Sequence, residues 1–270
     1  MKNLWVICRK ELASYFYAPI AYVVTAIFLV VSGYFFVNLV FAYADISQKV
    51  MSNPNDPYVA QYLAQFPLNA TEMIFRPLFS NTSVIMLLML PLLTMRLLAE
   101  EKKAGTFELL LTYPLRDIET VLGKFLACLL VFALMLGLTL IYPFLLLSLE
   151  TPGMATGLEF GPLLSNYLGL LLLGGAFIAF GLFASSLTSN QIIAAVISFG
   201  ALLLLWLIGF SAENAGPVLG GFLRHISLLE HFENFSKGLL NSQDVIYYVN
   251  VIVFCLFLTL RSLESNKWRG

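Results

Sequence analysis

The sequence has little charge and few of the side chains that form catalytic or metal sites. Only 11% of its 270 residues are charged, while 59% are hydrophobic. A soluble globular domain carries about 25% charged residues. A chain of this length with so little charge cannot enclose all its apolar side chains in one soluble core, so lipid must cover the rest. The composition therefore predicts an integral membrane protein.

The net charge and the cysteine content argue against a nucleic-acid-binding protein and against a disulfide-linked or zinc-binding one. A net charge of −1 leaves no basic surface to replace the counterions of phosphates, so we expect no nucleic-acid partner. The three cysteines are odd in number and far apart, which suggests neither a disulfide framework nor a zinc site. His225 and His231 fall in the last external loop with Glu230 and Glu233, on a short helix expected at the outer surface. Their spacing predicts no metal site.

Long stretches without charge predict six transmembrane helices, since a helix needs roughly 20 apolar residues to cross the hydrocarbon layer. The polar run from Ser185 to Gln191 divides the longest stretch into two spans. The predicted spans cover residues 20–41, 78–95, 125–149, 163–184, 192–210 and 245–260. We expect an all-α fold with a single transmembrane domain over residues 1–270, kinked at Pro91 and Pro143.

The distribution of lysine and arginine predicts the topology. If the N-terminus is cytoplasmic, eleven of the fifteen basic residues fall on the cytoplasmic side: Lys2, Arg9, Lys10, Arg96, Lys102, Lys103, Arg116, Lys124, Arg261, Lys267 and Arg269. Six spans then return the C-terminus to the cytoplasm. The first apolar run is long and lacks a cleavage site, so we expect it to remain as a membrane anchor.

Residues 2–17 predict an amphipathic helix in the inner headgroup plane, ahead of a turn at Pro19. Its apolar face would hold Leu4, Trp5, Cys8, Leu12, Tyr15 and Phe16, opposite Arg9, Lys10 and Ser14. The other interpretation is a flanking segment that only sets the topology.

The cytoplasmic segment 96–124 contains a second short helix with an exposed apolar face. Gly105 permits a sharp break, Thr106 is a good N-cap, and Glu108 falls in the first turn. Phe107, Leu110 and Leu111 then form a small apolar face that ends at Pro114. Such a helix suits docking into a partner's groove, although a simple surface connector is equally compatible with the pattern.

Several motifs in this segment resemble the type-2 ABC transporter permeases (the ABC-2 type). They are Thr94-Met95-Arg96, Glu100-Glu101-Lys102-Lys103, Gly105-Thr106, Glu108-Leu109-Leu110, Pro114 and Leu122-Gly123-Lys124. The likeness extends over the whole chain in the number of spans and the loop lengths. The run Glu230 to Gly238, followed by Asp244-Val245, is similar to the gliding-motility-associated branch of that family.

The resemblance implies a permease subunit of an ATP-driven exporter in the bacterial cytoplasmic membrane. A separate ATPase dimer would bind ATP and Mg, and a second permease, identical or related, would complete the pathway. A periplasmic accessory protein is a further candidate partner. The residues implied in ATPase coupling are Arg9, Lys10, Glu11, Glu100, Glu101, Gly105, Thr106, Phe107, Glu108, Leu110 and Leu111.

The residues themselves agree that ATP is hydrolysed elsewhere. Gly123-Lys124 is followed by Phe125, and Ile118 stands where a phosphate-binding loop needs its first glycine. We therefore expect no enzyme activity and no cofactor in this chain.

Two other functions are alternatives to the exporter. One is a mechanotransmission or assembly protein that acts on a periplasmic partner without moving a substrate. The other is an intramembrane enzyme, for which no reactive constellation is present. No span has an ionisable residue at its centre, which disfavours an ion-coupled carrier.

Overall fold

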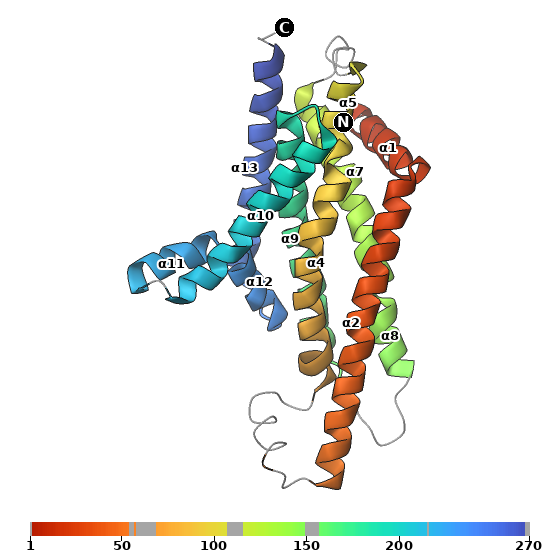
Figure 1. The fold of residues 1–270 in the computed structure, drawn as a ribbon, viewed down its shortest axis with the longest axis vertical. Helices are drawn as coiled ribbons and strands as arrows, with labels where there is room; N and C mark the ends of the chain where they lie inside the picture. The colour runs from red at the N-terminus through yellow and green to blue at the C-terminus, as the bar shows by residue number, and fades with distance from the viewer. Residues whose placement is uncertain are drawn as a thin grey trace.

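The computed structural model describes residues 2–53, 57, 69–106, 116–148, 157–214 and 216–267, and every element in these ranges is a helix (Figure 1). The elements are α1 (Lys2–Tyr17), α2 (Pro19–Ser52), the π-helix η1 (Thr71–Phe75), α4 (Arg76–Thr94), α5 (Arg96–Lys103), α7 (Asp117–Leu138), α8 (Ile141–Ser148), α9 (Phe160–Leu187), α10 (Gln191–Asn214), α11 (Pro217–Ile226), α12 (Leu228–Ser236) and α13 (Ser242–Lys267).

Six helical segments are long and apolar enough to cross a membrane, which confirms the predicted fold class. They are Pro19–Ser52, Thr71–Lys103, Asp117–Ser148, Phe160–Leu187, Gln191–Gly209 and Ser242–Ser265. Each predicted span falls on one of them. Both termini lie at the same end of the bundle (Figure 1), which we call the terminal end.

The third span was predicted over residues 125–149 with a kink at Pro143, and the structure differs from that prediction at its start. It begins eight residues earlier, at Asp117, and it divides into α7 and α8. Pro143 explains the break, because proline has no N–H to donate and its ring displaces the carbonyl four residues back. That carbonyl, of Thr139, accepts instead from the N–H of Tyr142 at 3.0 Å.

Helix α9 lies at the centre of the bundle and packs against α4, α7, α10, α12 and α13. Glycines allow two of these contacts to be very close. A Cβ at Gly174 would overlap the ring of Phe132 on α7, and a Cβ at Gly181 would overlap the side chain of Thr94 on α4. Small residues permit such backbone approach between membrane helices.

Helix α12 corrects the expectation of a short helix at the outer surface. Its first residues lie beside Leu173, halfway along α9. Farther along α12, Phe235 packs against Gly169. Gly238, just after α12, contacts Pro162 near the N-terminal end of α9. Helix α12 therefore packs along α9 from Leu173 to Asn166, whereas α11 projects sideways from the bundle (Figure 1).

A polar cluster joins α12 to the start of α13. The buried carboxylate of Asp244 lies 2.6 Å from Nδ1 of His231 and accepts from the amide of Asn234 at 2.9 Å. The ring of His231 also stacks on Tyr247, with 3.9 Å between the centroids. His231 therefore has a structural partner in Asp244.

Candidate functional site

The terminal end contains a buried lysine between two carboxylates. Lys124, eight residues into α7, is only 1% exposed. Its Nζ lies 2.9 Å from Oε1 of Glu11 on α1 and 2.9 Å from Oε1 of Glu101 on α5. A buried ammonium is stable only when it is paired and hydrogen-bonded. Lys124 therefore fixes three separate helices to one another, and we call Glu11, Glu101 and Lys124 the Lys124 cluster.

The Lys124 cluster has an exposed lysine at its rim and a buried carboxylate oxygen that is not paired within the described part of the chain. Lys10 lies at its rim, with Nζ 3.9 Å from Glu11 and 3.8 Å from Glu101, and its side chain is 67% exposed. Ion pairs as exposed as those of Lys10 contribute little to the stability of the fold. Among the described residues, Oε2 of Glu101 is buried without a hydrogen-bond partner. The cluster thus carries a surplus carboxylate oxygen on the side of α5.

Gly123 brings α1 close enough for the cluster to form. A Cβ at this position would lie 2.8 Å from Cγ2 of Ile7 and 3.3 Å from the carbonyl oxygen of Leu4. Any larger residue would push α1 away from α7. Gly123 and Lys124 both lie inside a regular helix, so this pair is no phosphate-binding loop.

A second set of contacts joins α1 to the junction of α4 and α5. The guanidinium of Arg96 donates to the hydroxyl of Ser14 at 2.8 Å, lies 3.4 Å from Glu100, and sits 5.3 Å from the centre of the Tyr15 ring. The hydroxyl of Tyr15 donates to the carbonyl of Leu93 at 2.8 Å. Burial raises the pKa of Tyr15 well above its ordinary value, so it stays a neutral donor.

These contacts fix which face of α1 turns toward the bundle. Cys8 and Tyr15 are buried, whereas Trp5 is 64% exposed and Phe16 is 42% exposed. Ser14, predicted opposite the apolar face, turns inward to Arg96. The face toward the bundle therefore differs from the predicted apolar face, because it also delivers Glu11 to Lys124.

Ser185, at the end of α9, fixes α5 to the centre of the bundle. Its hydroxyl accepts from the N–H groups of Leu98 and Ala99, at 3.1 and 3.0 Å, and donates to the carbonyl of Met95 at 2.9 Å. These are backbone groups at the α4–α5 break. The neighbouring carbonyl of Ser186 accepts from Lys102 and, at 3.2 Å, from Ser262 on α13. The start of α5 is therefore held by α9, and α9 in turn by α13.

A polar cavity of about 300 Å³ opens beside these contacts. Its walls come from α1, α5 and the start of α7. The lining residues are Lys10, Glu11, Ser14, Arg96, Leu97, Glu100, Glu101, Ala104, Thr106 and Lys124. Six of its ten lining residues are charged, so a charged partner could contact all three helices here.

The structure places some predicted site residues in this region and leaves others outside the described ranges. Lys10, Glu11, Glu100, Glu101 and Thr106 line the cavity. Arg9 is exposed, and Gly105 adopts φ +68° directly after α5, as a sharp break requires. The hydroxyl of Thr106 donates to the carbonyl of Glu101 at 3.3 Å. The remaining predicted residues, Phe107, Glu108, Leu110 and Leu111, lie outside the described residues, as does the rest of the predicted short helix.

The sequence reasoning missed Arg96 and Lys124 as site residues. Lys124 carried a signal, because it lies within the apolar stretch of α7, where an unpaired ammonium would be costly. Its partners are 113 and 23 residues away in the chain, and no local pattern identifies them.

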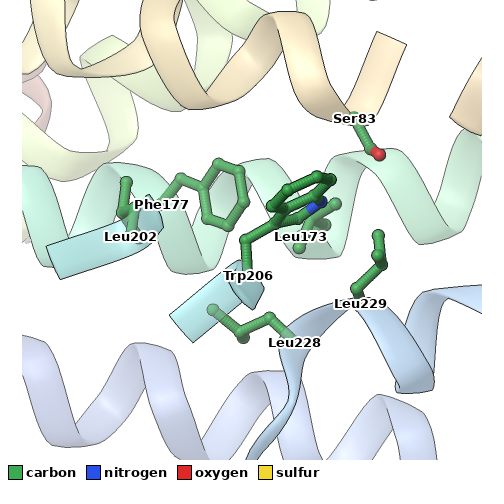
Figure 2. A pocket seen from close by; sticks show the side chains of 7 residues that line it. All are labelled: Ser83, Leu173, Phe177, Leu202, Trp206, Leu228 and Leu229. Carbon is green, nitrogen blue, oxygen red and sulfur yellow. The ribbon is translucent and has the colours of Figure 1, made fainter. Parts of the chain in front are cut away.

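The pocket shown in Figure 2, at the centre of the bundle, is too small to be a comparable site. Ser83, Leu173, Phe177, Leu202, Trp206, Leu228 and Leu229 line it, and the indole of Trp206 fills much of the space. Its volume of about 10 Å³ leaves room for no more than about one water molecule. Within the described ranges, no three His, Cys, Asp or Glu side chains gather in a group that could hold a metal ion.

The docking of α1 can be tested through Cys8, which is 2% exposed and whose thiol pKa is raised by burial. In a chain with Cys128 and Cys255 replaced by alanine, Cys8 should react slowly with maleimide. Gly123→Val should speed the reaction about tenfold, because overpacking costs about 1–3 kcal/mol and loosens α1. Gly137→Val, on the same helix with no atom within 4 Å, should leave the rate unchanged. Equal rates in both variants would show that α1 is not held by this contact.

Comparison with known proteins agrees with this architecture. The family model described as "ABC-2 family transporter protein" matches residues 5–261, which includes all three helices of the Lys124 cluster. No curated protein matches the chain.

Proposed function

The chain belongs to the ABC-2 family of transporter proteins, and on that premise we propose that it couples ATP hydrolysis in a separate ATPase subunit to export across the bacterial cytoplasmic membrane. Membership makes it a multi-pass membrane protein and the permease subunit of an ABC transporter. Four points go beyond family membership and are part of our proposal: the use of ATP, export as the direction of transport, the bacterial cytoplasmic membrane as the location, and the likeness to the gliding-motility-associated branch.

One observation carries the coupling proposal. The segment 107–115 begins four residues after α5 ends at Lys103, and α5 is fixed to α9 through Ser185 and to α1 and α7 through the Lys124 cluster. A force applied to that segment would therefore reach three spans and α1 together. This suits a rigid-body mechanism, in which closure of an ATPase dimer moves helices as units.

The placement of charge supports a cytoplasmic terminal end. Arg9, Lys10, Arg96, Lys102 and Lys124 all belong to the helices that meet there. Short segments rich in lysine and arginine stay on the cytoplasmic side, which is also the side where an ATPase finds ATP and Mg. A second permease subunit and a periplasmic accessory protein remain proposed partners.

The test is purification of the tagged chain from its native membranes in mild detergent, with bound ABC ATPases identified by mass spectrometry. We expect wild type to retain an ATPase and the double variant Phe107→Asp/Leu110→Asp to lose it, because two charges abolish an apolar docking face. The conservative double variant Phe107→Leu/Leu110→Met should retain the ATPase.

The possible failures have different meanings. If the aspartate variant inserts normally and still holds the ATPase, the docking role of residues 107–111 is wrong. If wild type brings down no ATPase, the proposed ATP-driven function itself is contradicted.

A further inference from the structure

An apolar groove runs between the first turns of α2 and the C-terminal half of α7. Its volume is about 310 Å³, and its lining is almost entirely apolar. On one wall lie the small residues Ala21, Thr25 and Ala26, and on the other lie Leu134 and Leu138. Tyr15 and Phe16 of α1 close the groove at the terminal end.

The two walls face each other without filling the space between them. Leu134 and Leu138 stay 48% and 46% exposed although they line the groove. Both walls belong to segments long and apolar enough to cross a membrane, so the groove opens into the hydrocarbon layer. Its occupant must therefore be apolar.

The surroundings of the groove favour a lipid chain as its occupant. The groove lies between two segments that can cross a membrane, and bilayer hydrocarbon therefore reaches its open side. A flexible acyl chain can fill this apolar space without any movement of α2 or α7.

Helix α1 supplies a cation for a headgroup on the terminal side of the groove, beyond Phe16. Phe16, which lines the groove, shares an outward face of α1 with Arg9, two helical turns earlier. The only acidic residue of α1, Glu11, is turned inward to Lys124. The outward charges of α1 among the described side chains are therefore cationic, as expected for contact with an anionic headgroup.

We propose that this groove binds one acyl chain of an anionic phospholipid, with the headgroup held beside Arg9 in the leaflet at the terminal end. The lipid would separate α2 from α7 directly beneath the helix that carries Glu11. This site does not depend on the proposed ATPase coupling.

Native mass spectrometry of the detergent-purified chain tests the site, with phosphatidylglycerol and phosphatidylcholine added in equal amounts. We expect wild type to retain one phosphatidylglycerol. Ala26→Trp should fill the groove and lower retention about tenfold, equivalent to the loss of two buried methylenes. Leu134→Trp, from the opposite wall, should do the same. Ile27→Trp is the matched control, since Ile27 is 44% exposed on the other side of α2, and it should keep the lipid.

A second variant tests whether the site prefers an anionic headgroup. Arg9→Gln should remove the preference for phosphatidylglycerol over phosphatidylcholine while leaving chain binding intact. The site is overturned if Ala26→Trp and Ile27→Trp retain equal amounts of lipid, or if wild type retains none. Equal retention of both lipids by wild type overturns the anionic assignment.

Discussion

Replacing Lys124 by methionine is expected to destabilise the folded chain by about 3–5 kcal/mol, the cost of removing one partner from a buried ion pair. The methionine fills a similar volume, but it leaves the carboxylates of Glu11 and Glu101 with only the exposed Lys10, at 3.9 and 3.8 Å, as a cation. Their side chains are only 12% and 16% exposed, so water compensates poorly. Thermal unfolding in mild detergent measures the loss.

Two controls separate the charge from the position. Lys237→Met removes an exposed partner of Glu233, at 3.3 Å and with 43% of the lysine side chain exposed, and should change stability by less than about 0.5 kcal/mol. The triple variant Glu11→Gln/Glu101→Gln/Lys124→Met should recover most of the stability, because no uncompensated charge remains. If the single variant unfolds at the wild-type temperature, the cluster does not hold the three helices together.

The spans were predictable from the sequence because the physics that sets them is local. Charged residues cannot lie in hydrocarbon without cost, so each charge-free gap coincides with a helix, such as the stretch from Glu11 to Asp45 with α2. Pro19 likewise marked the end of α1 at Tyr17. These features need only the residue types and their spacing.

The site was less predictable because it depends on contacts between distant segments. The amphipathic pattern of α1 identified a helix, but not that Glu11 would turn inward, since Lys124 lies 113 residues away. Ser185 appeared only as part of a polar hairpin, yet its hydroxyl makes three bonds to the α4–α5 break. Contacts of this kind depend on how α9 packs.

The same limit applies to the last loop, where polarity placed His231 at the outer surface. The structure instead packs α12 along α9, because Gly169 leaves room for Phe235. The polar residues are then satisfied by one another, His231 and Asn234 by Asp244.

Replacing Asp244 by alanine is therefore expected to release α12 from α13. Asp244 is 3% exposed and accepts from both His231 and Asn234. Its loss leaves two donors without an acceptor, which costs about 3 kcal/mol in total. Amide hydrogen exchange across residues 228–236, followed by mass spectrometry, should become about a hundredfold faster. Asp244→Asn, which keeps one acceptor oxygen, should give an intermediate rate.

A matched control lies on α12 itself. Glu233→Ala removes a carboxylate that is 56% exposed and pairs only with the exposed Lys237 among the described residues, and exchange should stay at the wild-type rate. The effect of Asp244→Ala should also stay local, because α12 meets the half of α9 farther from Ser185. ATPase retention should therefore be unchanged in Asp244→Ala and reduced in Lys124→Met. Unchanged exchange in Asp244→Ala would show that apolar packing on Gly169 alone holds α12 in place.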